Sequence, residues 1–131
     1  MERVKLKMPL TKYSIQKHYR KSHRSSHLDL RILDPRKKKR LWSWALVKER
    51  FPEDGEKLLA IRTPDHRLEY MYFEGELENR DKVTLFDKGI CDIIHDGSYL
   101  KIFYFKGEKI NGAYNFIRLH SNVWLVTKAK K

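Results

Sequence analysis

Short strands are predicted along most of the chain. Apolar and polar residues alternate with a period of two, which is typical of strands with one buried face. This pattern predicts strands over residues 13–18, 27–33, 41–48, 58–62, 83–86, 90–95, 99–105, 113–119 and 123–127. In the second half, turn sequences recur about every ten residues, a spacing typical of an all-β barrel or sandwich.

Loops and turns are predicted between these strands. Residues 19–26 are basic and polar, residues 63–75 indicate a loop or short turn, and residues 87–89 (Asp-Lys-Gly) indicate a turn. The length suits one domain. We therefore expect residues 1–131 to form a single all-β domain that is mainly antiparallel.

One face of the predicted strand at residues 27–33 carries candidate chemistry. His27, Asp29 and Arg31 alternate with apolar residues and therefore share one wall. A neutral imidazole and a carboxylate are ligands for a divalent metal, and a guanidinium binds phosphate through two hydrogen bonds. A solvated strand face can carry the same three residues, so the row by itself leaves both interpretations open.

The charge balance indicates an anionic partner. Lysine and arginine number 29 against 17 aspartate and glutamate residues, which gives a net charge of +12. Nucleic acid is the commonest partner of a small basic domain. An acidic membrane surface is the alternative, although no stretch has the length of a spanning helix. The five consecutive cations at residues 36–40 suit either a phosphate-backbone contact or a solvated hairpin tip.

The start of the chain and its cysteine content favour a cytoplasmic protein. Lys5 and Lys7 interrupt the apolar residues at the start of the chain, unlike a secretory signal. Cys91 is the only cysteine, so an internal disulfide is excluded. It lies in an apolar run and is expected to be a buried structural thiol.

Other kinds of site have no motif in the sequence. There is no glycine-rich phosphate loop, no pair of cysteines for zinc and no nucleophile elbow. Histidine and carboxylate without sulfur suit Mn²⁺, Zn²⁺ or another divalent metal. Such an ion could activate water for attack at phosphorus. The residues predict a metal-assisted phosphoesterase acting on nucleic acid, with a non-catalytic nucleic-acid-binding β-barrel as the alternative.

Five ordered blocks resemble the 3′-phosphoesterase domain of ligase D in its stand-alone form. They cover residues 13–76, with a looser similarity at 105–112, and read Ser14-Ile15-Gln16-Lys17-His18, His27-Leu28-Asp29-Leu30-Arg31, Ser43-Trp44-Ala45-Leu46-Val47-Lys48, Asp65-His66-Arg67-Leu68-Glu69-Tyr70 and Phe73-Glu74-Gly75-Glu76. The resemblance implies a compact β-barrel, and we expect it to have short helical turns and to be a monomer.

The same resemblance implies 3′-end processing in non-homologous end joining. The family removes a terminal 3′ ribonucleoside and then a 3′-phosphate, and leaves a 3′-hydroxyl for a polymerase or ligase. Its preferred metal is manganese. The expected partners are primer-template 3′ ends, DNA or RNA, together with a repair ligase and polymerase, and no membrane is expected.

By position, the resemblance assigns His18, His27 and Asp29 to the metal. The connection between the two histidines is longer than the family usually has. His23 lies within it and is an alternative first ligand. Residues 78–81 stand where the family has a glycine-rich stretch.

The resemblance also assigns the residues that act on phosphate. Arg31 and His66 match the phosphate-binding and charge-stabilising residues, and Tyr70 matches a tyrosine that supports the histidine through its hydroxyl. Lys48, at the end of the tryptophan-rich strand, matches a further phosphate contact. Leu58 stands where the family tends to have an arginine.

Overall fold

The structure is a computed structural model that describes residues 10–130. Within that range no helix is long and apolar enough to cross a bilayer. Two 3-10 turns, η1 (Lys21–His23) and η2 (Leu68–Tyr70), accompany the strands, which are β1 (Leu10–Arg20), β2 (Ser25–Leu33), β3 (Arg40–Leu46), β4 (Lys57–Arg67), β5 (Gly75–Glu76), β6 (Lys82–Asp96), β7 (Leu100–Gly107), β8 (Asn111–His120) and β9 (Val123–Lys128). The predicted all-β fold with short helical turns is confirmed.

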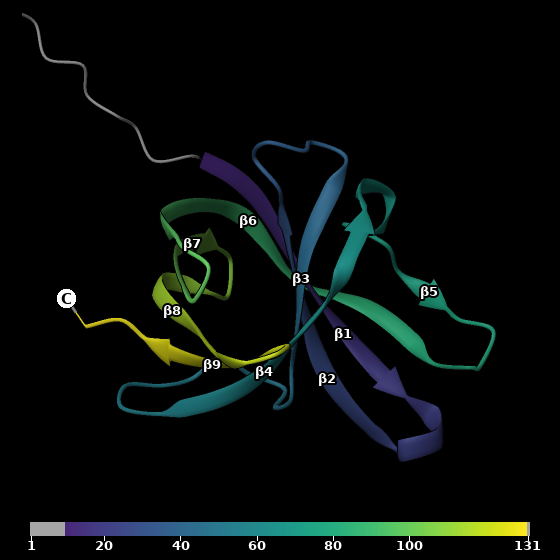
Figure 1. Ribbon diagram of the computed structural model, residues 1–131. Helices are drawn as coiled ribbons and strands as arrows, with labels where there is room; N and C mark the ends of the chain where they lie inside the picture. The colour runs from purple at the N-terminus through teal and green to yellow at the C-terminus, as the bar shows by residue number, and fades with distance from the viewer. Residues whose placement is uncertain (1–9, 131) are drawn as a thin grey trace, which may run out of the picture.

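Pairing between β1 and β6 closes the sheet into a barrel (Figure 1). The strands of the barrel follow the order β1-β2-β3-β4-β9-β8-β7-β6, and the short β5 pairs with the first two residues of β6. All of these pairings are antiparallel. Closure leaves no long open edge on the barrel wall and decides between the barrel and the sandwich that the pattern allowed.

Aromatic side chains fill the barrel interior. Trp44 is fully buried. Its ring centroid lies 5.7 Å from that of Phe103, 5.1 Å from Phe116 and 5.5 Å from Trp124. Such tilted and edge-to-face pairs add to the stability gained from apolar burial. Cys91 is buried in the same core, and burial raises the pKa of its thiol, as expected for a structural cysteine.

The predicted turn at residues 87–89 is wrong, because β6 runs through it without interruption. Asp87 is buried in the barrel wall instead of marking a turn. Its carboxylate accepts hydrogen bonds of 3.0, 3.1 and 2.9 Å from the amides of residues 108–110, and one of 2.8 Å from the Tyr13 hydroxyl. A buried carboxylate satisfied by these donors holds the strand to its neighbours.

The loop predicted for residues 63–75 is also partly wrong, since β4 continues to Arg67. Pro64 made a strand look unfavourable because proline cannot donate to a ladder. In the structure Pro64 lies at an irregularity, where the β3–β4 pairing passes from Ser43–Thr63 to Leu41–His66. A proline is tolerated at such a bulge, and the strand carries His66 beyond it.

Candidate metal and phosphate site

A cleft of about 410 Å³ lies against the outward-facing side chains of β1 to β4. These residues alternate with the apolar residues that point into the barrel. The cleft is lined by His18, Arg20, His27, Asp29, Arg31, Ala45, Thr63, Pro64, His66, Tyr70, Leu77 and Val83. Six of the seven residues that the sequence assigned to metal or phosphate are therefore brought together.

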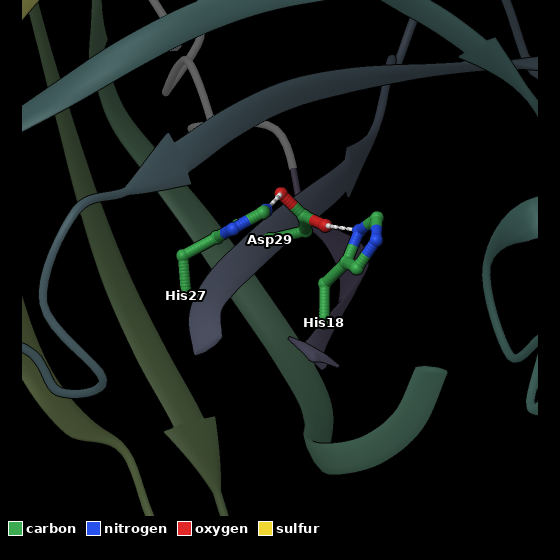
Figure 2. Close-up of side chains that lie close together, drawn as sticks. All are labelled: His18, His27 and Asp29. Carbon is green, nitrogen blue, oxygen red and sulfur yellow. Dashed lines mark ion pairs between the residues drawn. The ribbon is translucent and has the colours of Figure 1, made fainter. Parts of the chain in front are cut away.

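His18, His27 and Asp29 all line this cleft, and their side chains lie close together (Figure 2). His18 lies directly opposite His27 in the β1–β2 ladder. One ligand atom from each of the three residues lies within 4.8 Å of the others. The Asp29 carboxylate lies between the rings, 3.4 Å from His18 Nδ1 and 3.0 Å from His27 Nε2. Two imidazoles and one buried carboxylate oxygen are a donor set that fits a divalent cation.

The electrostatics of this cluster favour positive charge at its centre. Burial alone would raise the pKa of Asp29. Hydrogen bonds from His18 and His27, together with the charge of Arg31, instead hold the pKa of Asp29 well below its ordinary range. Contact with Asp29, and then with Asp81, raises the pKa of His18 although burial opposes it. The carboxylate is therefore charged at neutral pH and available to a metal ion.

Arg31 and His66 form the second part of the site. Arg31 is buried, and its Nη1 lies 3.3 Å from His66 Nδ1 while its Nε donates to Gln16 Oε1 at 3.0 Å. A guanidinium only donates, so we assign His66 Nδ1 as the acceptor and place the imidazole proton on Nε2. Burial, and then the charge of Arg31, lowers the pKa of His66. His66 is therefore a neutral imidazole with an N–H group to offer.

Tyr70 packs beside this pair. Its ring is edge-on to the His66 ring at a centroid distance of 5.3 Å, and the Arg31 guanidinium carbon lies 5.7 Å from the Tyr70 centroid. The rings of Tyr70 and His66 are thus in contact, and the role of the phenolic hydroxyl that the resemblance implies stays a prediction. The Gln16 amide donates to the carbonyls of Tyr70 and Phe73 at 2.7 and 3.0 Å, which ties this segment to β1.

Two other candidates lie outside the cleft. His23, in η1, is exposed and contacts Arg20 and Ser22 at 3.2 and 2.8 Å. The cluster therefore contains His18, and His23 stands apart from it. Lys48 is exposed after the end of β3 and is not among the residues that line the cleft.

Two polar residues of the site were not predicted from the sequence. Gln16 shares the outward face of β1 with His18, so the period-two pattern contained a signal for it. Asp81, whose Oδ2 lies 2.9 Å from His18 Nε2, comes from the connection between β5 and β6. No local pattern marks Asp81, because the contact depends on how a distant segment packs.

Comparison with known proteins identifies the family. The family model described as the DNA ligase D 3′-phosphoesterase domain matches residues 16–118. The chain is 32% identical over 126 residues to the multifunctional non-homologous end joining protein LigD of Mycobacterium bovis, an alignment that covers 90% of this chain and 16% of that protein. It is 30% identical over 136 residues to LigD of Pseudomonas aeruginosa, covering 92% of this chain and 15% of that protein.

A third relative is the multifunctional non-homologous end joining DNA repair protein LigD of Mycobacterium tuberculosis H37Rv. It is 35% identical over 98 residues, which cover 69% of this chain and 13% of that protein. The chain therefore spans less than a fifth of the length of each of these relatives. On the extent of the family match, the chain belongs to the DNA ligase D 3′-phosphoesterase domain family.

Proposed function

We propose that this protein is a Mn²⁺-dependent phosphoesterase that removes a 3′-terminal ribonucleoside and a 3′-phosphate from nucleic-acid ends. The observation that carries the proposal is the adjacency of two parts of one cleft. The donor set of His18, His27 and Asp29 adjoins the Arg31–His66 pair, since Arg31 Nη2 lies 3.7 Å from Asp29 Oδ2. Membership of the phosphoesterase family supports this reading of the two parts.

The donor set would hold the metal ion. Mn²⁺, with Zn²⁺ as the alternative, would lower the pKa of a water molecule and neutralise a phosphate oxygen. His18, His27 and Asp29 fix the position at which that chemistry is available. The charged state of Asp29 makes the cluster receptive to a cation without a prior loss of a proton from the carboxyl group.

Arg31 and His66 would bind the reacting phosphate. Arg31 is held by Gln16 on one side and by His66 on the other, so its remaining N–H groups are oriented before substrate arrives. The neutral His66 would donate a hydrogen bond from its Nε2–H group to a second non-bridging oxygen. Donors placed in this way stabilise the charge that develops at phosphorus as water adds and the ester oxygen leaves.

A nucleic-acid substrate suits the charges around the cleft. The net charge is +12, and residues 36–40 are all exposed cations. Their loop lies next to η2, because the Leu68 amide donates to the Lys39 carbonyl at 3.0 Å. Phosphates upstream of the reacting end would meet these cations. We infer that the protein prepares 3′ ends for a repair ligase and polymerase, and that Lys48 is a candidate for a more distant phosphate contact.

The test is a primer-template with a single 3′ ribonucleotide and a label inside the primer strand. With Mn²⁺ we expect a product shorter by one nucleoside with a 3′-phosphate, followed by the 3′-hydroxyl form, and EDTA should stop both. Parallel DNA and RNA primers would identify the preferred strand. Tight, salt-sensitive binding with no turnover in Mn²⁺ would overturn the enzymatic proposal in favour of a nucleic-acid-binding module.

A further inference from the structure

Asp81 lies on the side of His18 that faces away from the other candidate ligands. His18 Nε2 is 2.9 Å from Asp81 Oδ2, whereas His18 Nδ1 faces Asp29 Oδ2 at 3.4 Å. Both ring nitrogens are therefore engaged, one toward the donor set and one toward Asp81. Asp81 is 6% exposed, so its contact with the ring is largely protected from water.

The orientation of Asp81 is set by four further contacts. Its Oδ1 accepts from the Lys21 amide at 3.0 Å, and its Oδ2 accepts from Asn79 Nδ2 at 3.2 Å. The Asp81 amide donates to Asn79 Oδ1 at 3.0 Å, and its carbonyl accepts from the Leu77 amide at 2.8 Å. Arg80 adopts a left-handed conformation with φ 73° to make this turn, which is uncommon for a residue other than glycine.

These contacts connect two of the segments in which the sequence differs from the pattern that the resemblance led us to expect. Asp81 belongs to residues 78–81, and Lys21 belongs to the connection between His18 and His27. The Asp81 carboxylate accepts a hydrogen bond from the Lys21 amide and also contacts the His18 imidazole, which precedes that connection. A buried carboxylate that is held in place by such a turn and contacts one ring nitrogen fixes the side-chain torsions of the histidine.

We propose that Asp81 is a positioning residue that fixes His18 for metal binding. By accepting a hydrogen bond from the Nε2–H group, Asp81 leaves the Nδ1 lone pair directed toward the donors of His27 and Asp29. A carboxylate behind a ligating histidine fixes its tautomer and raises its basicity, and its loss costs about 10–100-fold in metal affinity. The inference rests on the proposed function, because it assumes that His18 is a metal ligand.

Asp81 also tethers the loop after β1, so its two actions must be separated. Lys21→Pro removes the amide that donates to Asp81 Oδ1 and leaves the carboxylate and His18 unchanged. Proline is suited to the first position of a short helical turn, which Lys21 occupies in η1. Arg20 before it is already extended, with φ −98° and ψ 104°, as a residue before proline prefers.

The primary measurement is Mn²⁺ affinity by titration calorimetry, together with the electron paramagnetic resonance signal of free Mn²⁺. We expect Asp81→Ala to bind Mn²⁺ about 10–100-fold more weakly than the wild type and Lys21→Pro to stay within about threefold. Glu78→Gln removes one negative charge from an exposed position of the same segment, as Asp81→Ala does, and should bind Mn²⁺ like the wild type. At saturating Mn²⁺, Asp81→Ala should recover most of the wild-type rate.

A second measurement reports on the ring itself. With Zn²⁺ as a diamagnetic substitute, the wild type should show a slowly exchanging His18 Nε2 proton in proton–nitrogen spectra, and Asp81→Ala should lose it. If Asp81→Ala does not fold, Asp81→Asn replaces it, with a loss of about tenfold expected. Equal Mn²⁺ affinity in the wild type and the Asp81 variant, or an equal loss in Lys21→Pro, would overturn the positioning role. A wild type that binds no Mn²⁺ would overturn the metal site as well.

Discussion

The Arg31 guanidinium and the His66 imidazole lie 3.3 Å apart, from Nη1 to Nδ1, although 35 positions separate them in the chain. Because arginine cannot give up its proton, the contact makes Nδ1 an acceptor and keeps the His66 proton on Nε2. Arg31, which is proposed to bind phosphate, thus also determines which ring nitrogen of His66 carries the proton. This relationship defines what a substitution at Arg31 should change.

Arg31→Lys should separate catalysis from metal binding. Lysine keeps the charge but cannot contact Gln16, His66 and a phosphate at the same time. We expect kcat to fall by about 10²-fold, as for loss of a preorganised transition-state donor, while the Mn²⁺ dissociation constant changes by less than about threefold. Arg36→Lys, an exposed change on the β2–β3 loop, is the control. A loss of Mn²⁺ as large as that in Asp29→Asn would mean that the role of Arg31 is misassigned.

Asp29→Asn and His27→Ala should abolish Mn²⁺ binding and 3′ trimming. Each removes one of the donor atoms that lie within 4.8 Å of one another. Calorimetry with Mn²⁺ and the labelled primer-template assay measure the two effects, and circular dichroism checks the fold. His23→Ala is the matched control, since His23 lies outside the cleft and should bind Mn²⁺ normally. Full trimming by either cluster variant would refute the assignment of these ligands.

Gln16→Leu should lower both stability and activity. The fully buried amide serves Arg31, Tyr70 and Phe73, and leucine of similar size leaves their polar groups without a partner. We expect the free energy of unfolding in urea to fall by about 1–3 kcal/mol. Ser14→Ala is the control on the same face of β1, because the buried Ser14 hydroxyl has no hydrogen-bond partner within residues 10–130 and its removal should cost little.

His18 and His66 should titrate on opposite sides of the ordinary histidine pKa of 6.5 in the metal-free protein. The pKa of His18 is raised, so its contribution to folding is complete below 6.5 and is lost as pH rises through the raised value. The pKa of His66 is lowered, so its contribution is present above 6.5 and is lost as pH falls. Proton NMR titration measures both midpoints directly.

Urea denaturation provides the check on that sign. His66→Asn keeps an acceptor for Arg31 but removes the titrating group. The variant should therefore lose less stability than the wild type when the pH falls below 6.5. Identical pH dependence in the two proteins would show that His66 does not titrate as its surroundings imply.

The cationic loop should contribute to nucleic-acid affinity without affecting chemistry. Replacing Lys37, Lys38 and Lys39 with glutamine should lower the salt slope of DNA binding by about two to three units, while kcat at saturating substrate is unchanged. The control replaces three other exposed lysines: Lys106 on β7, Lys109 in the turn between β7 and β8, and Lys128 on β9. Equal salt slopes in the two triple variants would show that residues 36–40 contribute no more to DNA binding than other exposed lysines do.

The sequence predicted the strand character of most of the chain and failed where a local signal was overridden by a distant partner. Asp87 looked like a turn residue, but donors from residues 108–110 satisfy its carboxylate inside a continuous strand. Pro64 looked like a strand breaker, but pairing with β3 resumes beyond it at His66. Both errors concern hydrogen bonds to residues that no short window of sequence contains.

By itself the sequence determined that His27, Asp29 and Arg31 share one wall, because the direction of a side chain in a strand is a local property of the backbone. The basic net charge, and the presence of histidine and carboxylate donors suited to a divalent metal, likewise follow from the residue types in the sequence. Only the tertiary structure decided that His18 joins this wall while His23 and Lys48 do not, and that Asp81 lies behind the ring. Those contacts depend on strand register, barrel closure and loop packing, which join residues far apart in the chain.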